Sequence, residues 1–91
     1  MNPPEKPNSS RLQLQEQFRI RLQKAKADYD DSSRHFSKVL AEQNQGLIPA
    51  PDGSHAVRQA RVRESAALAE YMRVLRMFTE LVIHDKLPEE H

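Results

Sequence analysis

Three arginines near the middle of the chain, Arg58, Arg61 and Arg63, have no acidic residue among them. Guanidinium groups bind phosphate oxygens well, so this spacing predicts, as one alternative, an anion or nucleic-acid patch. Acidic residues follow from Glu64 onward, and no aromatic residue is interleaved for base stacking. Nucleic-acid binding is therefore the second hypothesis rather than the first.

Glu64 is a carboxylate at the centre of an otherwise apolar helical stripe. An antiparallel pairing of the two predicted helices places it opposite Ser32 and Ser33, which interrupt the other stripe. A carboxylate at a helix seam lowers stability unless it is paired or hydrogen-bonded. We interpret this polar layer as a device that fixes register, as a buried Asn does in coiled coils. The alternative is a carboxylate metal site at the centre of a bundle, formed by two copies of Glu64.

Asp28, Asp31 and His35 follow one another at spacings that could offer two carboxylates and an imidazole to a divalent metal. One helix supplying three ligands is a weak signal, and Asp31 with Arg34 or His35 forms an ordinary surface pair. We predict no metal site here.

The sequence lacks the motifs of common enzyme chemistry. The chain has no cysteine and only two glycines, so it lacks a reactive thiol and a glycine-rich phosphate loop. No serine stands in a nucleophile-elbow context. We therefore predict a protein that is not an enzyme, with no cofactor and no small-molecule substrate.

Two long helices are expected, over residues 10–44 and 54–85. Ser10 with Gln13 forms a capping box for the first helix, and Ser54 caps the second. Between them both glycines and two prolines predict a turn, with Gly46 as the left-handed residue after the first helix. The expected organisation is a proline-rich tail over residues 1–9, a helical hairpin over 10–87 and a short tail over 88–91.

The first helix carries a narrow apolar stripe, whereas the C-terminal half of the second is apolar over a wider arc. In an antiparallel hairpin Phe18 faces Leu81, and a flank with Met72, Met77 and Ile83 finds no partner within the chain. We therefore predict an all-α hairpin that dimerises into a four-helix bundle, or that binds a helical protein partner. The expected interface residues are Tyr71, Met72, Leu75, Met77, Phe78, Leu81, Val82 and Ile83.

Composition limits the remaining classes. Hydrophobic residues make up 37% and charged residues 30% of the 91, and 14 basic residues nearly balance 13 acidic ones. No apolar run approaches the length of a membrane span, and the absence of cysteine fits a reducing compartment. We expect a cytoplasmic protein, not bound to a membrane, that acts through self-association and protein-protein interaction.

Overall fold

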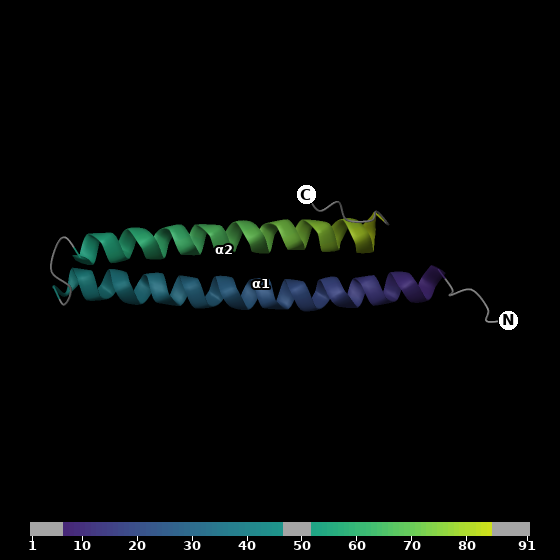
Figure 1. Ribbon diagram of the computed structural model, residues 1–91, viewed down its shortest axis with the longest axis horizontal. Coiled ribbons are helices and arrows are strands. Elements are labelled where there is room, and N and C mark those ends of the chain that lie inside the picture. The colour runs from purple at the N-terminus through teal and green to yellow at the C-terminus, as the bar shows by residue number, and fades with distance from the viewer. Residues whose placement is uncertain (1–6, 47–51, 85–91) are drawn as a thin grey trace.

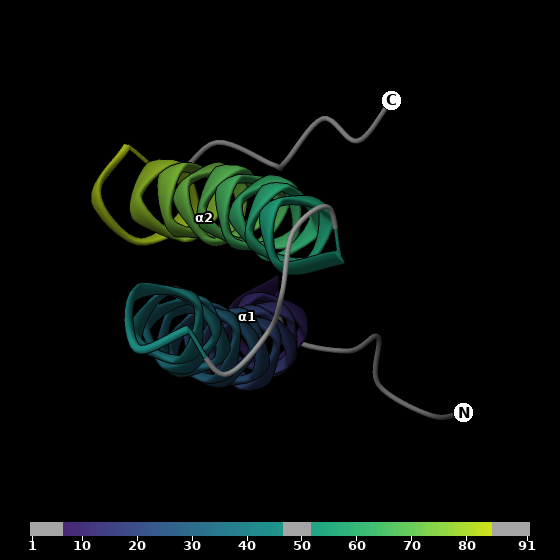
Figure 2. The same ribbon diagram turned by 90° about the vertical axis from the view of Figure 1, so that its left-hand side faces the viewer.

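The computed structural model describes residues 7–46 and 52–84, with side chains from residue 10 onward, and these residues form two helices. Helix α1 spans Pro7–Asn44 and helix α2 spans Asp52–Ile83. The helices lie side by side and run in opposite directions (Figure 1), and each has the other as its one neighbour within the described ranges (Figure 2). The all-α hairpin is thereby confirmed. Residues 1–6, 47–51 and 85–91, which include most of the expected turn and tails, lie outside the described residues.

Both helices begin before the serines that were predicted to cap them. Helix α1 starts at Pro7, one turn before Ser10, so residues 7–9 belong to the helix rather than to a tail. Proline suits a first helical turn because its fixed φ is helical and its missing N–H would have no partner there. Helix α2 starts at Asp52 instead of Ser54, and a carboxylate there is stabilised by the positive end of the helix dipole.

The end of α1 matches the prediction for Gly46. Its φ of 73° is left-handed. Its N–H donates to the Gln43 carbonyl at 3.0 Å, and the Gln45 N–H donates to the Ala41 carbonyl at 3.0 Å. These bonds satisfy carbonyls that the end of a helix otherwise leaves unpaired.

The contact between the helices follows a strict seven-residue repeat. Buried and half-buried positions recur at alternating spacings of four and three residues, which is the pattern of a coiled coil. In α1 this seam contains Phe18, Leu22, Ala25, Tyr29, Ser32, Phe36, Val39 and Gln43. In α2 it contains Gly53, Val57, Ala60, Glu64, Ala67, Tyr71, Val74, Phe78 and Leu81.

The seam positions fall into two classes by size. One position in each repeat is buried or, at Ala67, half-buried. Over the middle of the hairpin the residues at this position have small side chains, namely Ala25 and Ser32 in α1 and Ala60 and Ala67 in α2. The other position is half-buried and larger, and includes most of the aromatic residues. Small side chains at every seventh residue let two helix backbones approach closely, so the larger side chains are displaced toward one side of the pair.

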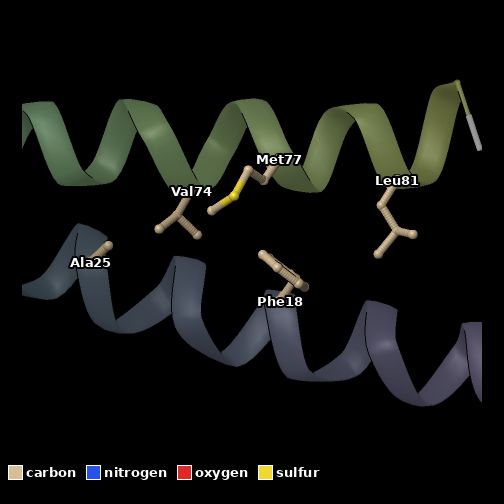
Figure 3. Packing of buried hydrophobic residues seen from close by; sticks show 5 residues of the cluster. All are labelled: Phe18, Ala25, Val74, Met77 and Leu81. Carbon is tan, nitrogen blue, oxygen red and sulfur yellow. The ribbon is translucent and has the colours of Figure 1, made fainter. Parts of the chain in front are cut away.

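The main core cluster lies toward the far end of the hairpin from the turn. Figure 3 shows Phe18 of α1 pointing toward α2 between Met77 and Leu81, and Ala25 opposite Val74. Val74 and Leu81 are each 1% exposed. The predicted pairing of Phe18 with Leu81 is therefore confirmed. Beyond this cluster α1 extends past the end of α2 (Figure 1), and its first described side chains, such as Leu12, are exposed.

Candidate interaction surface

The two sides of the hairpin differ in chemistry. On one side, a groove with Ala25 and Val74 at its base is bordered by Arg21, Asp28 and Glu70. A second groove on that side has Val39 and Ala60 at its base, with His35 and Arg63 among its lining residues. We call this side the small-residue face, and its borders are charged.

The opposite side, here called the aromatic face, carries the larger seam residues. Tyr29 and Tyr71 stack across the helices with ring centroids 6.3 Å apart and an interplanar angle of 22°. Further along, the Arg61 guanidinium lies over the Phe36 ring, 5.7 Å from its centroid. Aromatic rings in such offset contacts remain partly open to solvent, so they leave apolar surface on this face.

A second apolar stripe on α2 borders the aromatic face. Leu68, Met72, Leu75 and Val82 are 40%, 53%, 36% and 48% exposed. They continue the alternation of four- and three-residue steps, with Thr79 at the remaining position. We call these four apolar residues the outer stripe. Helix α2 thus has two coiled-coil seams, of which α1 covers one.

The corresponding positions of α1 are mainly polar. Lys26 and Asp30 lie where an apolar seam would continue, and they form an ion pair with Nζ and Oδ2 3.0 Å apart. This pair raises the pKa of Lys26, chiefly through the hydrogen bond from the ammonium to Asp30. Helix α1 therefore offers no matching stripe at this level, and the continuous stripe of exposed apolar residues belongs to α2.

The predicted interface set divides into three groups in the structure. Leu81 and Met77 are buried against α1, and Tyr71 and Phe78 are half-buried and pack on the same core. The other four, Met72, Leu75, Val82 and Ile83, are exposed. The assignment of Met77 to an exposed flank was wrong. It lies three residues after Val74 and four before Leu81, so its flexible side chain reaches the core beside Phe18 (Figure 3).

The predicted interface set did not include Leu68, which is exposed in the structure. On a helical wheel with 100° per residue, Leu68 falls within the same broad apolar arc as the seam residues. The four-and-three alternation is the signal that separates it. Positions seven residues apart, such as Leu68 and Leu75, repeat on the outer stripe, whereas Ala67 and Val74 repeat on the seam.

The predicted polar layer does not form as expected. Ser32 is 1% exposed, but its hydroxyl donates to the Tyr29 carbonyl of its own helix at 2.9 Å. Because a hydroxyl has one proton to donate, Ser32 has none left for a Glu64 carboxylate. Counting along both seams from the Tyr29–Tyr71 pair also places Ser32 level with Ala67, and Glu64 level with Phe36.

Ser33 lies one residue off the seam and is half-buried, as is Glu64. The expectation of a shared Ser32, Ser33 and Glu64 layer is therefore wrong, because Glu64 lies level with Phe36, about one helical turn along α1 from the two serines. A register role for Glu64 alone stays a prediction.

The three arginines of the predicted anion patch do not share one groove. Arg58 and Arg61 line a groove on the aromatic face with Gln43 and Ser54, whose side chains are hydrogen-bonded at 3.2 Å. Arg63 lines a groove on the small-residue face. An anion would therefore meet at most two of the three guanidinium groups at once.

Within the described residues, no group of three His, Asp or Glu side chains is placed to hold a metal ion. Asp28 and His35 lie two helical turns apart, and the Asp31 carboxylate accepts a hydrogen bond from Arg34. The alternative of a metal site at Asp28, Asp31 and His35 is not supported by this arrangement.

Glu70 is the acidic group whose titration the structure most clearly perturbs on α2. Arg73 donates to both of its carboxylate oxygens, at 2.7 Å and 3.0 Å. These hydrogen bonds lower the pKa of Glu70 below its ordinary value.

Neither described helix combines the length and apolar character that crossing a bilayer demands.

The sequence matches no protein-family model, and no curated protein or solved structure shows significant similarity to it. The arrangement of the two helices and their exposed stripe is therefore the basis for a functional assignment.

Proposed function

We propose that this protein is a helical hairpin that acts through self-association and protein-protein interaction, with the outer stripe of α2 as its binding surface. The observation that carries the proposal is the second coiled-coil repeat on α2, whose four side chains remain 36–53% exposed in the hairpin. A repeat of this kind is useful to a helix only where a further helix packs against it.

The absence of cysteine supports a reducing compartment, and we propose the cytoplasm.

The energetics favour reversible binding. Full burial of a large aliphatic side chain is worth about 1.5–3 kcal/mol. Covering the surface that the four outer-stripe side chains still expose to solvent therefore gives roughly 1 kcal/mol for each side chain. A matching stripe on the partner about doubles this gain, and association costs about 4–15 kcal/mol. The half-buried Tyr71 and Phe78 beside the stripe add further apolar area. With the lowest association cost, the four residues alone give a dissociation constant of about 1 mM, and with the added aromatic area we expect values between about 10 µM and 1 mM.

The nucleic-acid hypothesis has less support. Its three arginines lie on two faces, and Arg61 already stacks on Phe36. It stays a prediction that filter binding to DNA or RNA at low salt can test.

Substitution of Met72 by Asp tests the proposal. A charge in the outer stripe should reduce the self-associated fraction at least tenfold by light scattering, while helix content measured by circular dichroism stays unchanged. Ala66→Asp is the matched control, because Ala66 is exposed on the opposite side of α2. If both variants associate like the parent chain, the outer stripe is not the binding surface.

A further inference from the structure

We infer that the occupant of the outer stripe is the outer stripe of a second copy of this chain, running antiparallel, with Leu75 nearest the two-fold axis. This inference rests on the proposed function and specifies its partner. It is carried by the pattern of the stripe and by the basic residues that precede it.

Three apolar residues of the stripe are placed symmetrically about Leu75, while Met72 comes to lie about level with Thr79 of the second copy. Leu68 and Val82 each lie seven residues from Leu75. When two copies run antiparallel about Leu75, Leu68 of one copy lies level with Val82 of the other. A two-fold axis at this point makes the surface complementary to itself, as an isologous dimer requires.

The basic residues of α2 disfavour the parallel arrangement. Stepping back from Leu68 along the same line leads through Ser65 to Arg61 and Arg58. In a parallel pair each residue meets its own copy, so these guanidinium groups would face one another across the seam. Like charges placed opposite each other in a helix pair are destabilising.

The antiparallel arrangement places the same arginines favourably. With Leu75 at the centre, Arg61 passes beyond Ile83, where α2 of the second copy ends. The guanidinium groups of the two copies are thereby separated at opposite ends of the pair, and the like-charge contact of the parallel arrangement is avoided.

The chain's own α1 does not compete for this surface. It already occupies the first seam, and its equivalent outer positions include the Lys26–Asp30 ion pair. A second α2 is therefore the element of this protein that offers a matching apolar stripe.

Disulfide cross-linking tests the orientation, since the chain has no native cysteine. Leu75→Cys should give a covalent dimer on mild oxidation. Leu68→Cys or Val82→Cys alone should not, because each thiol would lie about 21 Å along the axis from its copy, which is beyond disulfide reach. An equal mixture of these two variants should cross-link efficiently. Ala66→Cys, on the opposite side of α2, is the control that should remain monomeric on a non-reducing gel.

The possible outcomes separate this inference from the proposed function. Self-cross-linking of Leu68→Cys would show a parallel pair and overturn the antiparallel assignment. If the parent chain sediments as a dimer and Met72→Asp abolishes the dimer, failure of Leu75→Cys to cross-link would show that the outer stripes pair about another point and would overturn the inference alone. A strictly monomeric parent chain would reject both this inference and self-association. Circular dichroism of each variant checks that the hairpin is retained.

Discussion

Gly46 shows how one residue ends a helix in this protein. Its left-handed φ of 73° is unfavourable for residues with a side chain, whereas nothing lies within 4 Å of where a Cβ would be. We therefore expect Gly46→Ala to destabilise the hairpin by about 1 kcal/mol through backbone strain rather than a clash. Gly46→Asn should cost less, because Asn tolerates this conformation better. Urea unfolding of the three chains would measure this, and an Ala variant as stable as the parent would contradict it.

The Glu70–Arg73 pair gives stability that depends on pH. Because the folded-state pKa of Glu70 is lowered, the pair stabilises the fold above the ordinary glutamate pKa and loses its effect as pH falls through the folded-state value. Both side chains are about half exposed, so solvent screens the pair and we expect about 0.2–0.5 kcal/mol.

Thermal unfolding of the parent chain and Glu70→Gln across the acid range would measure this contribution. The difference between the two chains should be largest near neutrality and should shrink as the pH falls through the lowered pKa of Glu70. A difference that stays constant down to pH 3 would show that the stability effect of Glu70 does not depend on its charge.

Single residues were predictable where local chemistry decides their role. Gly46 followed from its place after a helical pattern and before a proline-rich segment. Glu64 was placed about one helical turn from its actual level on α1, because the pairing of two helices depends on how their side chains pack along the whole seam. Met77 was misplaced because a long, flexible side chain next to the seam can enter the core.

At the scale of the elements, the two methionines of α2 form a matched pair with opposite environments. Met77 is 8% exposed in the core, and Met72 is 53% exposed on the outer stripe. Met77→Ala should lower hairpin stability by about 2–5 kcal/mol through the lost burial and the cavity it leaves. Met72→Ala should change it by less than about 1 kcal/mol.

The comparison needs urea unfolding at dilute protein concentration, where association does not contribute. Equal losses of stability for the two variants would contradict the assignment of Met77 to the hairpin core and Met72 to its surface.

The existence, direction and approximate length of both helices followed from apolar spacing and from the glycines and prolines between them. Their starting residues did not, because Pro7 and Asp52 are themselves suitable first-turn residues and lie before the serines that were taken as caps. The sequence analysis treated the seam and the outer stripe as one wide apolar face, since they lie on adjacent arcs of one helix. The two-helix contact separates them by covering the first and leaving Leu68, Leu75 and Val82 exposed.

For the molecule as a whole, stability should depend on concentration. A dimer that forms only from folded hairpins shifts the unfolding equilibrium by mass action, so the thermal midpoint should rise with protein concentration. In Leu75→Asp, which places a charge at the inferred two-fold axis, the midpoint should become independent of concentration. A midpoint that is constant for the parent chain would argue against coupled folding and association.

The central claim is that one hairpin leaves an apolar surface that another copy covers. Sedimentation equilibrium of the parent chain over a concentration series from about 10 µM to 2 mM, spanning the expected dissociation constant, tests it most directly. We predict a molar mass that rises from the 10.5 kDa of one chain toward twice that value. A constant mass of 10.5 kDa over the whole series would contradict the claim.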